Sequence, residues 1–363
     1  MSSFFGQHLK LSLFGQSHGA GIGVTVDGFP AGMDIDMDAL NAMMARRAPG
    51  QNAMTTARRE ADLPEFLSGV LNGRTTGQPI AAIIRNTDQH SRDYGDGVDL
   101  ARPGHADYTG HARYFGFEDW RGGGHFSGRL TAPIVLAGAL CMQWLEKQGV
   151  RVECHVKQLG NVVDDSLLDV PESADLSYLK TMTLPVLQEG LDKNMEAVIL
   201  AARDRQDSVG GVLECRAVGL PAGLGAPFFD SVESVLSHLL FSVPAVKGVS
   251  FGEGFNFAAL PGSVANDPLR MDGERIVTET NRAGGINGGI TNGMPVVFQC
   301  VIRATPSIAQ EQKTVSLKNR ENADIAVRGR HDPCILPRAV PVIEAMTAIG
   351  LMELWKERAA CVR

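Results

Sequence analysis

The chain has 363 residues, of which 44% are hydrophobic and 21% charged, and its formal net charge is -7 at pH 7. This composition is typical of a soluble globular protein with a substantial core and excludes a disordered chain. The negative charge argues against nucleic acid as the main partner. We find no run of about 18 apolar residues, so we expect no membrane span.

The first residues lack both the charged and the apolar region of a signal peptide, so we expect a cytoplasmic protein. The 6 cysteines have no CxxC or other metal-ligand spacing. In a cytoplasmic chain this pattern predicts reduced, mostly buried thiols and no metal site. The longest apolar stretch, residues 132–140, predicts a buried helix.

Strand and helix signals mix along the chain without strict alternation, which favours an α/β (α+β) fold class. The strand candidates are residues 79–85, 150–157, 211–218 and 294–303. The helix candidates are residues 36–47, 131–147, 195–205, 230–241 and 338–358. No Pro- or Ser-rich linker divides the chain, so we expect a single domain over residues 1–363. Neither GxGxxG after a strand nor a Walker A sequence is present, which disfavours the common nucleotide-binding folds.

A short sequence pattern occurs twice, about half a chain apart. Residues 24–32 read VTVDGFPAG and residues 216–223 read RAVGLPAG, and a helix candidate follows each copy. Both copies end in a turn signature. The pattern leaves two alternatives open: a chance similarity of short turns, or a duplicated β-α unit that gives a pseudo-two-fold architecture.

Two histidines lie in glycine-containing loops that suit proton transfer. His18 lies in GQSHG at 15–19, and His105 lies in RPGHADY at 102–108. Small neighbours leave an imidazole accessible to a ligand, and imidazole exchanges protons near neutral pH. Asp107 is close enough in sequence to orient His105. Each motif alone fits equally well a loop histidine without a chemical role.

A third segment predicts an anion-binding loop. It reads RGGGHFSGR at 121–129 and runs into the helix candidate that begins at Thr131. Glycines before a helix start expose backbone N–H groups at the positive end of the helix dipole, which suits a phosphate or carboxylate. Ser127 and Arg129 add further donors. A flexible turn is the alternative interpretation.

Two more glycine- or proline-containing segments follow. Residues 282–293 carry doubled glycines, which indicate backbone packed against either a flat ligand or another strand. Residues 329–334 read GRHDPC, where arginines near Asp332 would keep it ionised, so it fits a base or a structural ion pair. The arginines gather in these segments, which predicts a small anionic ligand in an acidic protein.

Taken together, the motifs resemble those of the chorismate synthase family over nearly the whole chain. The matching segments are GQSHG at 15–19, DGFPAG at 27–32, RRAPG at 46–50, RPGHADYT at 102–109, RGGG at 121–124, AVKGVSFGEGF at 245–255, AGGINGGITNG at 283–293, GRHDPC at 329–334 and RAVP at 338–341. So many ordered matches are highly specific.

The resemblance implies a lyase that converts 5-enolpyruvylshikimate 3-phosphate to chorismate and inorganic phosphate. The reaction is an anti 1,4-elimination that needs reduced FMN without net oxidation, in the shikimate pathway of aromatic amino acid biosynthesis. The resemblance also implies a β-α-β sandwich with internal pseudo-two-fold symmetry and a homotetramer. The sequence leaves open whether NADPH reduces the flavin on this protein.

The resemblance further implies roles for individual residues. His18 would protonate the departing phosphate, His105 would protonate the reduced flavin or hold its charge, and Asp332 would take a proton by way of the flavin N5. The residues implied in binding the substrate anions are Arg47, Arg102, Arg129 and Arg338. Those implied in binding FMN are His125, Ser127, Gly288, Arg303, Ala304, Thr305, Pro306, Ser307 and Arg330.

Departures from the family pattern put some of these contacts in doubt. Many members have Arg-Ser-Ser where this chain has His125-Phe126-Ser127, a basic residue at Ala53, Glu at Gln16 and at Leu130, and Lys-Pro at 303–304. His125 would replace an arginine only when protonated. Two alternatives to the lyase therefore remain in view, namely a flavin oxidoreductase and a non-catalytic ligand-binding homologue.

Overall fold

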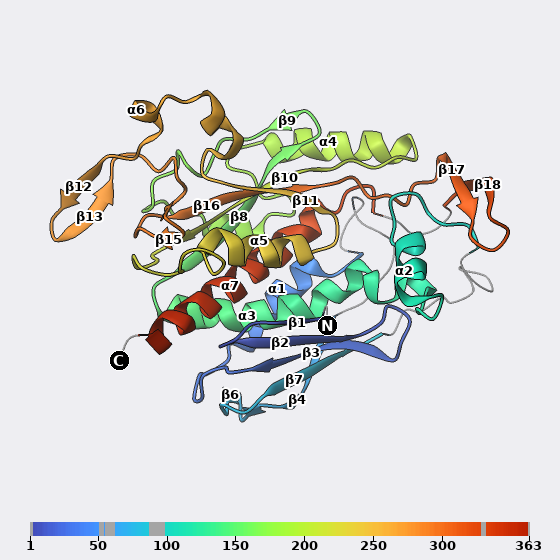
Figure 1. Ribbon diagram of the computed structural model, residues 1–363, viewed down its shortest axis with the longest axis horizontal. Helices are drawn as coiled ribbons and strands as arrows, with labels where there is room; N and C mark the ends of the chain where they lie inside the picture. The colour runs from blue at the N-terminus through green and yellow to red at the C-terminus, as the bar shows by residue number, and fades with distance from the viewer. Residues whose placement is uncertain (1–2, 51–53, 55–61, 87–98, 328–331, 362–363) are drawn as a thin grey trace.

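Two five-stranded antiparallel sheets enclose a layer of helices (Figure 1). The computed structural model describes residues 3–50, 54, 62–86, 99–327 and 332–361. The first sheet has the order β1 (Phe4–Phe5), β2 (Lys10–Gly15), β3 (Gly21–Asp27), β7 (Ile80–Arg85) and β4 (Pro64–Ser68). The second has the order β11 (Val246–Phe251), β16 (Val296–Ile302), β10 (Gly211–Val218), β8 (Arg151–Leu159) and β9 (Val162–Val163).

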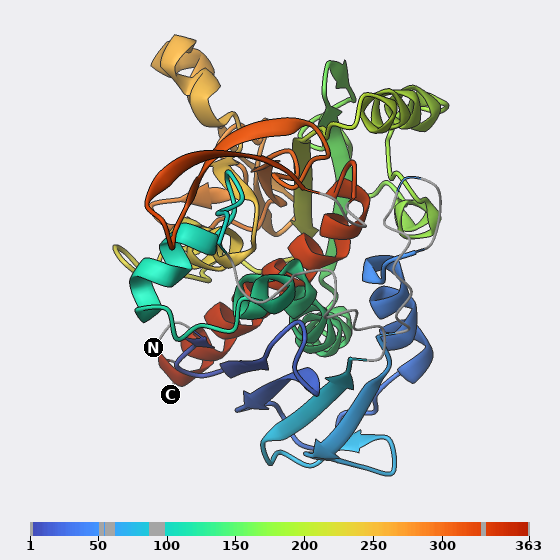
Figure 2. The same cartoon turned by 90° about the vertical axis from the view of Figure 1, so that its right-hand side faces the viewer.

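Four helices fill the space between the sheets, as both views show (Figure 1, Figure 2). They are α1 (Met37–Arg47), α3 (Thr131–Lys147), α5 (Val232–Ser242) and α7 (Leu336–Cys361). Outside this layer lie α2 (Asp107–Tyr114), α4 (Leu191–Asp204) and α6 (Gly262–Ala265). The remaining strands form small hairpins, namely β5 (Val70–Leu71) with β6 (Arg74–Thr75), β12 (Leu269–Asp272) with β13 (Arg275–Thr278), β14 (Ile286–Asn287) with β15 (Ile290–Thr291), and β17 (Glu311–Ser316) with β18 (Glu321–Ala326).

The expected mixture of helices and strands is confirmed, and every predicted helix and strand is present with ends shifted by a few residues. Local signals explain the agreement. Asp36 caps α1 by accepting from the Ala39 N–H, and Ser231 caps α5 by accepting from the Ser234 N–H. In β7 the burial alternates, as expected for a strand with one face on the core.

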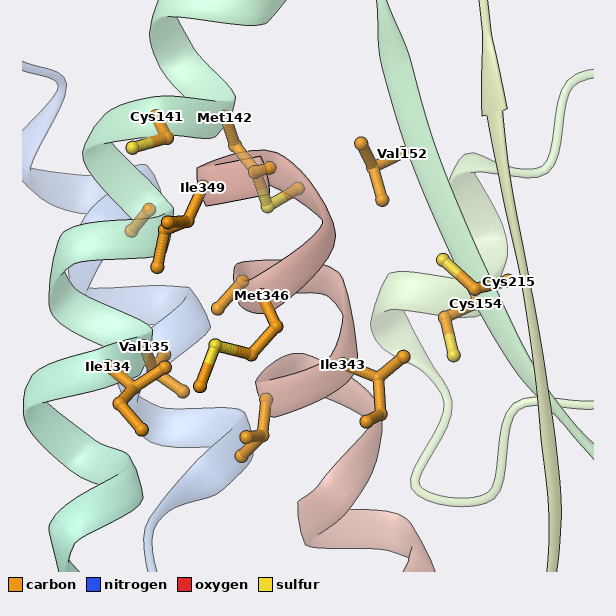
Figure 3. Close-up of a cluster of buried hydrophobic side chains, with 14 of the residues drawn as sticks. Ile134, Val135, Cys141, Met142, Val152, Cys154, Cys215, Ile343, Met346 and Ile349 are labelled. Atoms are coloured by element: carbon orange, nitrogen blue, oxygen red, sulfur yellow. The ribbon is translucent and has the colours of Figure 1, made fainter. Parts of the chain in front are cut away.

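The core lies where α3 and α7 pack against each other and against the second sheet (Figure 3). At Gly138 a Cβ would lie 2.2 Å from the Cβ of Ala345, so glycine permits this close approach of the two helices. Met346 and Ile349 of α7 are buried here, and Cys154 and Cys215 reach the core from the second sheet. The prediction of mostly buried thiols is confirmed, because only Cys361 of the six is exposed.

The predicted buried helix at 132–140 is part of α3, and residues 132–140 are all buried. The segment Arg121–Lys147, which includes α3, is the one stretch of the described residues long and apolar enough to cross a membrane. However, 89% of its most apolar window is buried inside the protein, and the core helix of a soluble protein passes the same test. Its apolar character is therefore explained by its place between the two sheets.

Candidate active site

A pocket of about 750 Å³ opens where α5 ends, α3 and α7 begin, and the glycine-rich loops meet. Its lining includes the apolar residues Leu13, Val243, Met346 and Ile349. It also includes most of the predicted site residues, which come from distant parts of the chain. These are Arg47, Arg102, His105, His125, Ser127, Arg129, Arg303, Thr305, Pro306, Ser307, Asp332 and Arg338.

Two arginines that line the pocket are paired with one buried carboxylate. Asp62 Oδ2 accepts from Arg47 Nη1 at 2.6 Å, and its other oxygen forms an ion pair with Arg129. Burial would raise the pKa of the Asp62 carboxyl, but the guanidiniums of Arg47 and Arg129 outweigh it and hold that pKa below its usual value. Burial also lowers the pKa of Arg47 to about 10. These three side chains leave an excess of positive charge beside the pocket.

His105 is held by the two charged residues of its own turn. Its Nδ1 lies 3.0 Å from Asp107 Oδ1 and 3.1 Å from Arg102 Nη2. Arg102 and Asp107 also form an ion pair at 2.7 Å. Burial would raise the pKa of Asp107, but hydrogen bonds from Arg102 and His105 lower it well below its usual value. A carboxylate that stays charged next to Nδ1 orients the ring.

His18 does not line the pocket directly but lies behind its wall. The side chain is buried, and a Cβ on Gly122 would lie 2.1 Å from two atoms of the His18 ring. Gly122 lines the pocket and has a φ of +59°. The neighbouring Ser17 N–H donates to the Gly124 carbonyl at 3.1 Å, so the two glycine-containing loops are joined. Glycine at position 122 therefore lets the imidazole approach the pocket.

Asp332 and Arg338 form an ion pair at the start of α7, with 2.5 Å between Arg338 Nη1 and Asp332 Oδ2. Arg338 Nε also donates to the Arg47 carbonyl at 3.0 Å. The arginine thereby joins the carboxylate to the end of α1. Both side chains line the pocket, which places Asp332 where it could accept a proton from a bound molecule.

The residues predicted to hold FMN divide into three groups. His125, Ser127, Arg303, Thr305, Pro306 and Ser307 line the pocket. Gly288 lies in the β14–β15 hairpin, which Figure 1 draws at the opposite end of the molecule from α2, and neither it nor Ala304 lines the pocket. Arg330 and Ala53 are outside the described residues. The assignments of Gly288, Ala304 and Arg330 stay predictions.

The pocket wall fits a flat cofactor with a phosphate. Thr305 Oγ1 is buried and has no hydrogen-bond partner among the described residues, so it has capacity for a ligand. At Gly104, which has a φ of +71°, a Cβ would lie 2.7 Å from Arg303 Nη2, so the glycine makes room for this guanidinium. Hydroxyl and guanidinium donors suit a phosphate, and the apolar residues of the pocket lining suit an aromatic ring system.

His125, which stands where many relatives have arginine, is engaged within the protein. Its Nδ1 lies 2.9 Å from the Gly15 carbonyl and its Nε2 lies 2.8 Å from Ser3 Oγ. Because a carbonyl only accepts, Nδ1 carries a proton. Phe126 packs its ring against Tyr114 of α2, with centroids 6.1 Å apart. His125 therefore links the chain start to the pocket wall in this structure.

Several residues at the pocket were missed in the sequence. Asp62, which pairs with Arg47 and Arg129, gave no signal of its own because a lone carboxylate in a polar stretch is common. Asn86, which accepts from Arg129, begins the segment NTDQHSRDY at 86–94, which also resembles the family pattern, but no role was predicted for it. The end of α5 and the following turn contribute His238, Pro244, Ala245 and Lys247. The segment AVKGVSFGEGF at 245–255 matched the family pattern, so it was the signal that could have found the last two.

The fold brings arginines, histidines and a carboxylate to one pocket, an arrangement that could bind a small anion and exchange protons with it. Comparison with known proteins is more specific. The family model described as chorismate synthase matches residues 9–355, and the chain belongs to this family. Its members are lyases that act on phosphates, so the chain is an enzyme of that class.

Individual relatives agree over almost the whole chain. A chorismate synthase of Dehalococcoides mccartyi is 42% identical over 355 residues, which cover 98% of this chain and 96% of the relative. One of Thermococcus kodakarensis is 42% identical over 348 residues, with 96% of each chain covered. A solved structure described as the crystal structure of chorismate synthase has a TM-score of 0.76 at 26% identity, and covers 98% of this chain and 93% of its own.

Proposed function

We propose that this protein eliminates phosphate from 5-enolpyruvylshikimate 3-phosphate to form chorismate, in the shikimate pathway. The observation that carries the proposal is the set of arginines, histidines and Asp332 gathered around one pocket in a chain of this family. A substrate with a phosphate and carboxylates needs several cations, and arginine forks bind such groups in pairs of hydrogen bonds. The alternatives of an oxidoreductase and of a non-catalytic homologue are not favoured by the family match.

The arginines bind and orient the substrate anions. Arg47, Arg102, Arg129 and Arg338 all line the pocket, and Arg47 and Arg129 are paired with Asp62. A carboxylate or phosphate brought into this cluster meets donors that other protein groups already hold in place. Such preorganised charge stabilises negative charge that develops on the leaving phosphate.

His18 supplies the proton that the departing phosphate needs. The ring lies in a water-poor position behind Gly122, and the loop that carries it is hydrogen-bonded to the 121–126 loop. In this proposal the imidazole donates a proton to the leaving oxygen as negative charge builds up there. His105, oriented by Asp107 at Nδ1, is the residue that we propose protonates the reduced flavin or holds its charge.

Asp332 is the base of the proposed reaction. Its carboxylate lines the pocket, and the ion pair with Arg338 fixes its direction. Reduced FMN held in this pocket would supply electron density for the release of phosphate, without net oxidation. Ser127, Arg303, Thr305, Pro306 and Ser307 are the residues that we propose hold it, and NADPH is a possible reductant for it.

We also propose that the chain is one domain, a β-α-β sandwich with internal pseudo-two-fold symmetry. The strand order β2-β3-β7-β4 of the first sheet corresponds to β8-β10-β16-β11 of the second. In each half the next helix, α1 or α5, follows the second of these strands, and α3 or α7 follows the last one in the chain. As the family resemblance implies, we propose a cytoplasmic homotetramer whose partner is the small-molecule substrate, not nucleic acid or membrane.

One experiment tests the proposed function. The protein is loaded with FMN, reduced without oxygen, and mixed with 5-enolpyruvylshikimate 3-phosphate. We expect equal amounts of phosphate and chorismate, while the flavin absorbance stays that of the reduced form. Absence of phosphate release, or oxidation of one flavin for each product formed, contradicts the proposal. Adding NADPH to oxidised protein under the same conditions tests whether the enzyme reduces its own flavin.

A further inference from the structure

The loop that carries His18 is built around the side chain of Asn86. This loop joins β2 to β3, and Asn86 follows β7, the neighbour of β3 in the first sheet. Asn86 Nδ2 donates to the Gln16 carbonyl at 3.0 Å and to the Gly19 carbonyl at 2.9 Å. Its backbone N–H donates to the Ala20 carbonyl at 3.4 Å. One residue thus holds the loop on both sides of His18.

The other end of the same amide contacts the arginine cluster. Asn86 Oδ1 accepts from Arg129 Nε at 2.9 Å. Arg129 in turn pairs with Asp62, whose second oxygen accepts from Arg47 at 2.6 Å. A continuous chain of side-chain hydrogen bonds therefore runs from Arg47 to the loop of His18.

The partners of Asn86 fix the orientation of its amide. A guanidinium N–H only donates and a backbone carbonyl only accepts, so the oxygen faces Arg129 and the NH₂ group faces the loop. Turning the amide over would place a donor against a donor and an oxygen against two carbonyls. Asn86 therefore has one orientation that satisfies its contacts with Arg129, Gln16 and Gly19. Aspartate has the same shape but can make only the contact with Arg129.

From this geometry we propose that Asn86 is a positioning residue, which transmits the placement of Arg129 to the loop of His18. The far side of this loop is already attached to the wall of the pocket, where the Ser17 N–H donates to the Gly124 carbonyl. The position of His18 then depends on the guanidinium that binds the substrate anion. The inference rests on the proposed role of His18 as the acid.

The test compares two changes at Asn86 with a control elsewhere. Asn86→Asp keeps the acceptor for Arg129 but puts a carboxylate oxygen against the carbonyls of Gln16 and Gly19. Asn86→Ala removes the contacts at both ends without adding charge. Asn281→Asp is the matched control, because Asn281 Nδ2 donates to a single carbonyl, that of Pro295, at 2.8 Å, and does not line the pocket.

Misplacing a catalytic group by about 1 Å costs on the order of 100-fold in rate, so we expect kcat to fall by about that factor in both Asn86 variants. KM for the phosphorylated substrate should stay within about 3-fold in Asn86→Ala, because the arginines remain. Asn281→Asp should retain the wild-type kcat. A wild-type kcat in folded Asn86→Ala, or a loss equal to that of the control, overturns the proposal.

A second readout does not depend on turnover. The ring signals of His18 are followed by NMR of histidine-labelled protein, assigned with His18→Ala, while inorganic phosphate is added. In the wild type and in Asn281→Asp phosphate should shift these signals, and in Asn86→Ala the shift should be lost. A retained shift in Asn86→Ala refutes the coupling. If His18→Ala kept full activity, the proposed acid would be wrong, yet this readout would still test the coupling.

Discussion

Two clusters of buried charge in this protein look alike in their contacts but differ in their surroundings. Beside the pocket, Asp62 pairs with Arg47 and Arg129. On the second sheet, the fully buried His155 lies 3.0 Å from Asp164 through Nδ1 and 3.0 Å from Glu214 through Nε2. Both clusters pair opposite charges out of contact with solvent, as buried charges require.

The second cluster is complete without a ligand. Glu214 also accepts from the Leu167 N–H at 2.6 Å and from Gln299 at 2.9 Å, and Asp164 accepts from the Leu187 N–H at 2.6 Å. Burial would lower the pKa of His155, but hydrogen bonds to Asp164 and Glu214 outweigh it and raise that pKa. None of the three residues is among those that line the pocket. The cluster attaches the segment that contains Leu167 and Leu187 to the second sheet.

The first cluster differs in having an excess of positive charge and a cavity next to it. Arg47 and Arg129 both line the pocket, and Arg338 contacts the Arg47 carbonyl nearby. The comparison teaches that burial and ion pairing alone do not mark a functional site. A functional site is marked instead by access to a cavity and by an unbalanced charge, because an incoming anion can then form favourable interactions with the cluster.

The largest expected effect is on catalysis at the pocket. Replacing His105 by alanine (His105→Ala) should lower kcat by about 10- to 10⁴-fold, the range for general acid–base groups. The unfolding free energy should change little, because the ring is partly exposed. Steady-state kinetics with excess FMN and urea unfolding measure the two quantities. Full activity would show that the Asp107-oriented imidazole has no role in the reaction.

The second cluster should give the opposite result. His155→Leu leaves two buried carboxylates without their cation, and breaking such a pair costs about 3–5 kcal/mol of stability. We expect a lower urea midpoint, with kcat per folded molecule unchanged. A large loss of kcat in folded protein, or a variant as stable as the wild type, would remove the distinction between the clusters.

A smaller effect is expected for substrate binding. Arg129→Ala should raise KM by about 10- to 100-fold, since a hydrogen bond to a charged group contributes about 1.5–3 kcal/mol. Arg203→Ala is the control, because Arg203 is on the surface of α4 with 48% of its side chain exposed. Equal KM values in the two variants would contradict an anion site at Arg129.

The smallest effects concern stability against pH, and the two clusters should respond at opposite ends. The lowered pKa of Asp62 contributes stability above the ordinary carboxyl pKa of about 3.9, and this is lost as pH falls. The raised pKa of His155 contributes stability that is complete below about pH 6.5 and lost as pH rises above it. The unfolding free energy is measured against pH for both variants. Compared with wild type, it should fall less steeply at acidic pH in Asp62→Asn and less steeply at alkaline pH in His155→Leu.

Most helices and most pocket residues could be predicted from the sequence, because their signals are local. The helix caps at Asp36 and Ser231 and the apolar faces located the helices within a few residues. The glycine-flanked histidines and the arginine-rich loops located most of the pocket. These motifs carry their chemistry in consecutive residues, so a linear reading recovers them.

What the sequence did not reveal depends on contacts between distant segments. Asn86 meets the His18 loop because β7 pairs with β3. Asp62, which precedes β4, meets Arg129 in the fold where β4 pairs with β7. Gly122 shows its purpose only when the His18 ring lies against it. His155 lies in a strand where alternation predicts one face on the core, but its outer face is covered too.

The central claim, that His18 next to the pocket wall and not His155 on the second sheet carries the chemistry, has a direct test. The rate of phosphate release in a single turnover is measured for wild type, His18→Ala and His155→Gln, without oxygen and at a temperature where all three are folded. We predict a fall of about 10- to 10⁴-fold for His18→Ala and a rate within about 2-fold of wild type for His155→Gln. Equal rates in His18→Ala and wild type would contradict the account.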